Sequence, residues 1–157
     1  MAILSLAGAQ ATLTTSYKTA LTISCASSNA RRFKIFDINI AAQGAPASTD
    51  TNIQFDLSKH TAAGTNTATT LIAADLGDSY WTSVGGANNT VEPTGPSATA
   101  GVFNIAMNQR APFRWQTYLG SGAELIFPAT ANNGASLRAL SAGYTGAAGG
   151  TIYFMEC

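Results

Sequence analysis

Apolar and polar residues alternate with a period of two along most of this chain, and the alternating runs are separated by stretches rich in Gly, Asn, Pro and Ser. A period of two is typical of extended strands, because successive side chains point to opposite faces, whereas a helical repeat is nearly absent. The pattern predicts strands over residues 18–26, 32–42, 52–59, 67–73, 100–109, 113–119, 123–129, 135–142 and 150–156.

The faces of some predicted strands follow from this alternation. In NIQFDLSK, Ile53, Phe55 and Leu57 share the face expected to pack into a core, while Asp56 and Ser58 lie on the face expected to meet solvent. The run RFKIFDINI is less regular, because apolar residues occur on both of its faces. Either a bulge switches the face within this strand, or both of its sides are covered.

Short strands at this spacing, without helical crossovers, predict an all-β protein. We expect an antiparallel β-sandwich of about eight to nine strands, with a jelly roll as the closest fit. The 157 residues fit one domain, and a domain of that size buries about 68–70% of the surface of its unfolded chain. Asn133-Gly134 predicts a tight hairpin between the segments 123–129 and 135–142.

The stretch 74–98 is rich in Gly, Pro and Asn and predicts a long connection that carries Tyr80 and Trp81. A long connection in a compact domain is usually functional or ordered by a partner. We therefore expect Tyr80 and Trp81 to be exposed and to contact a partner. An alternative function, a receptor- or glycan-binding module on a virion, would use them as a stacking platform.

Charged residues make up 10% of the chain, against roughly 25% in ordinary soluble domains, and the formal net charge is zero. A neutral chain offers no electrostatic footprint for nucleic acid and no polybasic segment for an anionic membrane, so neither partner is expected. Arg31 and Arg32 belong to the one local basic run. This run fits either a solvated strand start or a contact with a partner.

The first residues, MAILSLAGAQA, imitate a signal peptide, but they lack a basic segment and their apolar run is short. No window has the length and apolar character of a membrane span. We therefore expect a soluble chain made in a cytosol. In that compartment Cys25 and Cys157 are expected to be free thiols.

His60 is the only histidine, so a Ser-His-Asp hydrolase or a His-ligated metal site would have to use it. No Gly-x-Ser-x-Gly motif is present, and one His with two widely separated Cys makes no recognisable zinc ligand set. We expect His60 to end a strand and to bond loop backbone. No catalytic residue, metal or cofactor is expected, and the chain is not expected to be an enzyme.

Arg110 and Arg114 lie in the apolar segment MNQRAPFRW and are the only charged residues between Glu92 and Glu124. Pro112 cannot donate a backbone hydrogen bond, so it marks the start of the next strand and leaves Arg110 in the connection before it. A guanidinium has five donors, which can close loop carbonyls and meet a carboxylate such as Glu92 or Glu124. We therefore favour a structural clasp over partner contact, and both over catalysis.

Five segments occur in a characteristic order: DTNIQFDLSKHTAAGTNTATT (50–70), NNTVEPT (88–94), NQRAPFRWQT (108–117), GAELIFPATANNGASLRA (122–139) and TIYFME (151–156). Their order and spacing resemble small proteins of tailed bacteriophages, among them the capsid decoration or cement proteins, over about two thirds of the chain. The matching positions, which we interpret as turn and core determinants, are His60, Gly64, Thr65, Glu92, Pro93, Asn108, Arg110, Arg114, Trp115, Asn133 and Gly134. Cys157 departs from the pattern, because an acidic residue is usual there.

The resemblance implies a jelly-roll-like sandwich that joins the virion, as a homotrimer on the outside of an icosahedral shell. Its partner would be the major capsid protein, whose subunits it would bind across and so stabilise. The resemblance brings no catalytic residue to this chain. Residues 1–30 match least, so this segment, with the first strand, is left free to act as a docking arm beside a sandwich over 31–157.

Overall fold

The computed structural model describes residues 1–78, 80–96 and 101–157. These residues form strands and no helix, which confirms the all-β prediction. Residue 100 of the predicted strand 100–109, and residues 79, 97 and 98 of the predicted connection 74–98, lie outside the described residues. The strands are β1 (Ala2–Gln10), β2 (Lys18–Ser24), β3 (Phe33–Ala42), β4 (Asn52–His60), β5 (Thr65–Thr69), β6 (Ile72–Ala73), β7 (Val84–Val91), β8 (Phe103–Asn108), β9 (Phe113–Gln116), β10 (Leu125–Phe127), β11 (Gly134–Leu140) and β12 (Ala148–Glu156).

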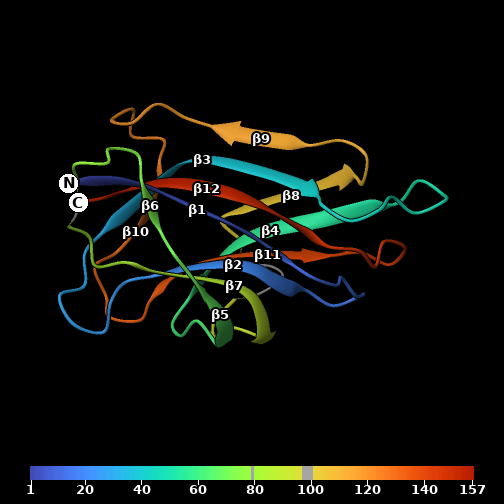
Figure 1. Ribbon diagram of the computed structural model, residues 1–157, viewed down its shortest axis with the longest axis horizontal. Helices are drawn as coiled ribbons and strands as arrows, with labels where there is room; N and C mark the ends of the chain where they lie inside the picture. Colours follow the sequence, from blue (N-terminus) through green and yellow to red (C-terminus); the bar gives the residue numbers. More distant parts are fainter. Residues whose placement is uncertain (79, 97–100) are drawn as a thin grey trace.

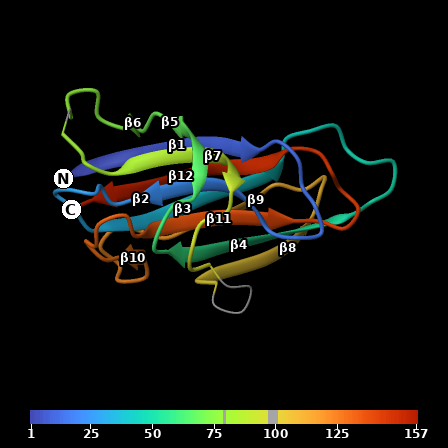
Figure 2. The same cartoon turned by 90° about the horizontal axis from the view of Figure 1, so that it is seen from below.

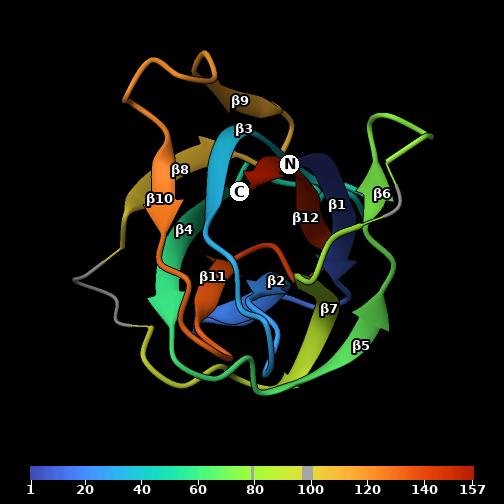
Figure 3. The ribbon, with the colours of Figure 1, turned by 90° about the vertical axis from the view of Figure 1, so that its left-hand side faces the viewer.

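The strands form two antiparallel six-stranded sheets that face each other as a sandwich (Figure 1, Figure 2). Sheet A has the order β10-β3-β12-β1-β6, and β9 also pairs with β3. Sheet B has the order β5-β7-β2-β11-β4-β8. Figure 3 shows the two layers end-on, with β3, β12 and β1 in one and β4, β11 and β2 in the other.

The strands pair as they would if one long antiparallel hairpin were folded over to form both sheets. β1 pairs with β12 and β2 with β11, while β3 pairs with β9 and β10, and β4 with β8. First-with-last pairing divided over two sheets is the arrangement of a jelly roll, so the predicted fold is confirmed. The strand number is higher than predicted because β1 and β7 are additional strands and because the predicted strand 67–73 forms both β5 and β6. β5, β6 and β7 are inserted between β4 and β8 in the chain.

The inserted strands widen both sheets at the same side of the sandwich. β6 adds to sheet A beside β1, and β5 and β7 add to sheet B beside β2. The single predicted strand 67–73 is therefore two strands in different sheets. β7 arises within the predicted long connection, and neither it nor β1 was expected as a strand.

The core lies between the sheets and confirms the predicted inner face of β4. Ile53, Phe55 and Leu57 are fully buried. In β3, a shift of register against β12 lets Ile35 and Ile38 both point into the core. The bulge interpretation of this strand is therefore the correct one.

Residues 1–30 do not form a separate arm. β1 lies in sheet A between β12 and β6, and β2 lies in sheet B between β11 and β7. Leu4 and Leu6 of β1 are fully buried in the core. Releasing this segment would remove one strand from each sheet, so any docking has to use the folded body of the sandwich.

Asn133 and Gly134 do not close a hairpin, because β10 belongs to sheet A and β11 to sheet B. The residues between these strands cross from one sheet to the other, and the Asn133 carbonyl accepts a hydrogen bond from Cys25 N at 2.9 Å. A side chain at Gly134 would place its Cβ 1.8 Å from the carbonyl oxygen of Ile23. Close packing of strands, rather than a turn, therefore requires glycine here.

The outer face of sheet B is covered, although we expected it to be wet. Asp56 and Ser58 on this face are 0% and 1% exposed. β7 and β8 lie on opposite sides of β2, β11 and β4 in sheet B. Among the described residues that follow β7 and precede β8, Thr94 forms a bridge with Ala62, and Gly101 lies against Asp56.

Candidate functional site

Arg110 forms a clasp, but its partner is not one of the two carboxylates that we expected. Arg110 Nε donates to Asp50 Oδ1 at 2.7 Å, and its Nη2 donates to the Ala47 carbonyl at 3.0 Å. The neighbouring Gln109 bonds Ala47 N at 3.0 Å and the Thr49 carbonyl at 2.8 Å. Together these contacts tie the loop before β4 to the connection between β8 and β9.

Arg114 forms a second clasp, between β9 and β3. Its Nε donates to Asp37 Oδ1 at 3.0 Å and its Nη2 to Asp37 Oδ2 at 2.5 Å, in the paired geometry that suits a guanidinium and a carboxylate. The hydrogen bond and charge of Asp37 raise the pKa of Arg114. Asp37 is buried while Arg114 is exposed, so the arginine compensates a carboxylate that the sheet has taken from water.

Glu92 and Glu124 each accept hydrogen bonds from a different segment of the chain. Glu92 Oε2 accepts from Thr19 N at 3.0 Å and from Thr19 Oγ1 at 2.5 Å, and Lys18 Nζ lies 3.9 Å from Oε1. Glu124 accepts from the backbone N–H groups of Gly120 and Gly122, and backbone hydrogen bonds lower its pKa. The four predicted clasp residues thus make structural contacts, but in separate places and without meeting one another.

The structure brings together two of the predicted partner-contact residues, Arg31 and Tyr80. The Arg31 guanidinium lies over the Tyr80 ring, 4.5 Å from its centroid, and Arg31 Nε is 3.9 Å from Glu156 Oε1. Glu156 is buried and accepts from Ser83 N at 2.7 Å and from Thr82 N at 2.8 Å. This carboxylate ties the end of β12 to the segment before β7 and holds Arg31 at the rim of the molecule.

Arg32 and Trp81 lie apart from this pair. Arg32 is exposed, and its carbonyl accepts from Cys157 N at 2.9 Å. Trp81 is half-buried, packs against the core and lines a hollow of about 320 Å³ beside β5 and β7. Tyr80 stacks with Arg31 and does not line this hollow, so the expected two-ring platform is not formed.

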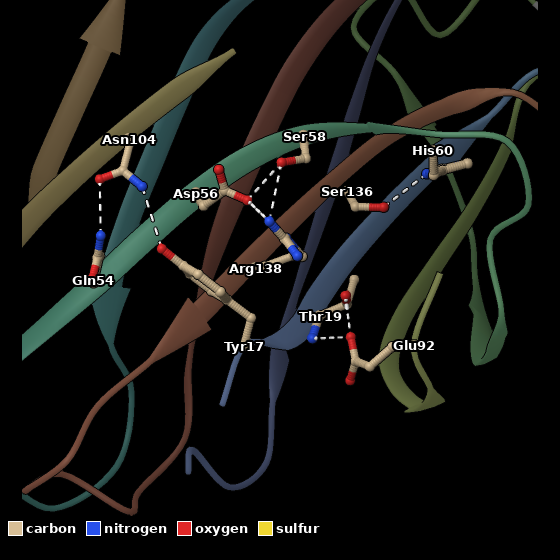
Figure 4. A network of polar contacts seen from close by, with 10 residues as sticks. All are labelled: Tyr17, Thr19, Gln54, Asp56, Ser58, His60, Glu92, Asn104, Ser136 and Arg138. Carbon is tan, nitrogen blue, oxygen red and sulfur yellow. Dashed lines mark hydrogen bonds and ion pairs between the residues drawn. The ribbon is translucent and has the colours of Figure 1, made fainter. Parts of the chain in front are cut away.

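A polar network that the sequence did not predict lies on the covered face of sheet B (Figure 4). Arg138 Nε donates to Asp56 Oδ2 at 2.7 Å, and Ser58 Oγ donates to the same oxygen at 2.7 Å. The Tyr17 ring covers the Arg138 guanidinium at 4.5 Å, and Asn104 Nδ2 donates to Tyr17 Oη at 3.3 Å. The Tyr17 ring thus shields the buried ion pair of Arg138 and Asp56 from solvent.

His60 belongs to the same face but bonds side chains, where we expected it to bond loop backbone. Its Nε2 is 2.9 Å from Ser24 Oγ, and its Nδ1 is 2.8 Å from Ser136 Oγ. Burial lowers the pKa of His60 from its ordinary 6.5 to about 4. A neutral imidazole between two hydroxyls joins β4 to β2 and β11, and Asp56 is committed to Arg138 rather than to His60.

The two cysteines are further side chains with reactive chemistry. Cys25 and Cys157 are free cysteines, and burial raises the pKa of the Cys25 thiol. Over the described ranges, no group of three or more His, Cys, Asp or Glu side chains is placed to hold a metal ion. Nor does this part of the chain contain a helix with the length and hydropathy that a membrane crossing requires.

β6 pairs with β1 near the end of the sandwich that carries both termini (Figure 1), and β1, β6 and the segment after β6 each carry exposed apolar side chains. Ile72 lies opposite Ser5 in the pairing of β6 with β1, and Ala74 N donates to the Ile3 carbonyl at 2.8 Å. Leu76, in the following turn, is 95% exposed. We call this surface the apolar edge; its members are Met1, Ile3, Ile72, Leu76 and Tyr80.

Comparisons with protein-family models, with curated proteins and with solved structures returned no match.

Proposed function

We propose that this chain is a structural virion protein that decorates a bacteriophage capsid and stabilises it by binding across subunits of the major capsid protein. The observation that carries the proposal is the apolar edge. Soluble monomers seldom expose contiguous apolar patches of large area, and such patches mark interaction sites. The resemblance to phage decoration proteins supplies the identity of the partner.

The composition of the apolar edge suits a neutral partner surface. Four of its members, Met1, Ile3, Ile72 and Leu76, have non-aromatic apolar side chains, and Arg31 is stacked on the ring of the fifth, Tyr80. Protein interfaces have apolar centres and polar rims, and Tyr and Arg are enriched in them. Glu156 lies beside Arg31, so this part of the surface carries little net charge. We therefore infer docking by shape and apolar burial rather than by charge.

The apolar edge belongs to the folded body, because β1 and β6 are both strands of sheet A. A preorganised surface binds without the loss of conformational entropy that ordering a free arm would require. Docking through this edge thus replaces docking through an N-terminal arm, while residues 1–30 still contribute Met1 and Ile3.

Binding at the seams between capsid subunits favours the intact shell by RT ln(1 + [L]/Kd), about 4.1 kcal/mol per site at a thousandfold excess over Kd. As part of the proposal, a homotrimer on the capsid exterior would present three apolar edges at once. Linked sites raise the overall avidity without new contacts. Modest contacts at each edge then suffice to hold the trimer on the shell. In this proposal the chain is synthesised in the host cytoplasm before it binds.

The experiment compares purified virions that carry this chain with virions that lack it. Both are heated or treated with mild denaturant, and release of the genome is followed together with loss of the chain. We expect the chain to leave before or together with weakening of the shell, and we expect particles without it to open at lower temperature. Equal retention of the genome in both kinds of particle would contradict the proposal.

A further inference from the structure

A hollow lies between the inserted strands and the segment before β7. It encloses about 320 Å³, and its lining includes Trp81, Thr69, Thr70 and Ser83. Trp81 is half-buried against the core, so its ring is held in place. Val84, which is exposed at the start of β7, forms one border of the hollow.

A second hollow adjoins the first on the other side of Val84. It encloses about 430 Å³, and its lining includes Ser24, Ser27 and Asn132. Val84 lines both hollows, so we treat the two as halves of one groove that meet at Val84. We call it the Val84 groove.

None of the described residues that line the two halves of the Val84 groove carries a charged side chain. A charged ligand would lose part of its hydration there without gaining an ion pair from the lining, which is unfavourable. The groove therefore selects against acidic and basic ligands. The volume of each half lies near the lower end of the range of about 300–1,000 Å³ for ligand pockets. An elongated ligand that fills both halves therefore fits the groove best.

The polar groups of the groove are hydroxyls and an amide. Thr69 Oγ1 donates to the Thr67 carbonyl at 3.2 Å, and Ser83 Oγ donates to Glu156 Oε2 at 2.5 Å. A hydroxyl that donates still has lone pairs with which to accept, and the Trp81 indole adds an apolar face with one N–H donor. A sugar ring has the complementary features, since its hydroxyls both donate and accept and its C–H faces are apolar.

A peptide is a poorer fit for the same groove. Extended peptides bind by adding a strand to an open sheet edge. At the start of β7, Val84 pairs with Ser24 of β2 and Gly85 pairs with Thr69 of β5, so both sides of β7 are occupied. The backbone groups of β7 at the groove are thus already used within sheet B, and a peptide strand would have to add to β5, the edge strand of that sheet.

We infer that the Val84 groove binds a neutral, unbranched oligosaccharide, with one sugar ring against Trp81 and the following rings beyond Val84 beside Ser27 and Asn132. This binding site is distinct from the apolar edge and does not depend on the proposed capsid role. Because each half of the groove is small, affinity is expected to grow with chain length until both halves are filled.

The test begins with the intact protein on an array of neutral and charged glycans. A Trp115→Phe variant then leaves Trp81 as the only tryptophan, so that its fluorescence reports titration with neutral oligosaccharides of two to six rings from the series that binds. We expect saturable changes in emission, with binding about tenfold tighter for the hexamer than for the dimer. Silence of the array, or binding of charged glycans alone, would overturn the inference.

Matched variants locate the ligand in the groove without removing the core-packed Trp81. Thr70→Arg places a long charged side chain in the first half, and Thr67→Arg makes the same change on an exposed residue that does not line the groove. Ser27→Arg and Ser28→Arg form the corresponding pair for the second half. Thr70 and Ser27 line the groove, whereas Thr67 and Ser28 do not. Only Thr70→Arg and Ser27→Arg should therefore weaken binding.

We expect Thr70→Arg to weaken binding of the hexamer and of the dimer about tenfold or more. Ser27→Arg should remove the advantage of the hexamer and leave dimer affinity unchanged. Equal losses of glycan affinity in the two members of either matched pair would contradict the site. Binding of a peptide that competes with the glycan and gains affinity through its backbone amides would also contradict it. Unchanged thermal unfolding of each variant confirms that the changes in binding are local.

Discussion

Arg138 on β11 and Asp56 on β4 form an ion pair whose side chains are 9% and 0% exposed, with Arg138 Nε 2.7 Å from Asp56 Oδ2. The two residues lie directly opposite each other in the strand register. Two charges have therefore been removed from water on the outer face of a sheet, where alternation of side chains predicts solvent. Ser58 and Tyr17 stabilise the pair there, since the Ser58 hydroxyl donates to Asp56 Oδ2 and the Tyr17 ring covers the Arg138 guanidinium.

Replacing Arg138 with Met should destabilise the protein strongly. The substitution leaves Asp56 as a buried carboxylate without its guanidinium, and breaking a buried pair in this way costs about 3–5 kcal/mol. Urea denaturation at pH 7 measures the loss. The double variant Asp56→Asn, Arg138→Met removes both charges and should recover much of the stability. A single variant no less stable than the double variant would show that the pair contributes little.

Acid should weaken the fold through His60. The pKa of His60 is about 4 in the folded protein against 6.5 ordinarily, so between these values the unfolded chain holds more protons than the folded one. Stability from this residue is therefore fully present above pH 6.5 and is lost as the pH falls toward 4. At about 1.4 kcal/mol per pKa unit the loss is of order 3 kcal/mol.

Urea midpoints at pH 7 and pH 4.5 measure this loss, and the carboxylates titrate in the same scans. A His60→Gln variant isolates the contribution of the imidazole, because it keeps every other titratable group. Its stability should fall less over this pH range than that of the original protein. Identical pH profiles for the two proteins would mean that His60 does not carry the acid sensitivity.

The two arginines of MNQRAPFRW should differ in importance. Arg110 and Asp50 are both exposed, and an exposed ion pair contributes about 0–1 kcal/mol. Arg114 compensates the buried carboxylate of Asp37, and a buried polar group left without its partner costs about 1–3 kcal/mol. Thermal or urea unfolding of Arg110→Ala and Arg114→Ala should therefore rank Arg114→Ala as the less stable. The reverse ranking would contradict the clasp assigned to Arg114.

The parts of the fold that the sequence predicted are those in which local pattern and tertiary position agree. The alternation in β4 predicted Ile53, Phe55 and Leu57 as its inner face, and they are buried. β7 was missed because VGGANNTV has the composition of a loop. Its glycines are required by neighbours, since a Cβ on Gly85 would lie 2.8 Å from both Leu6 and the Thr69 carbonyl oxygen. Such a requirement is visible only when the strands are assembled.

The polar network was not predictable because it depends on topology. The sequence places Asp56, Ser58 and His60 on one face of β4, but only the assembled structure shows that these three side chains are buried there. The partner of Arg110 was missed for a similar reason, because Asp50 is distant in sequence and is exposed in a loop. Residue spacing alone does not report which loops meet at one end of a sandwich.

The most direct test of the proposed capsid decoration is co-sedimentation of the purified chain with shells assembled from the major capsid protein that we propose as its partner. Leu76→Asp places a charge in the apolar edge, and Val91→Asp makes a matched change on an exposed residue at the far end of β7. Because both positions are exposed, both variants should unfold at the temperature of the original protein. We predict that the original chain and Val91→Asp sediment with the shells and that Leu76→Asp stays in solution. Failure of the original chain to sediment, or equal binding by Leu76→Asp, would contradict docking through this edge.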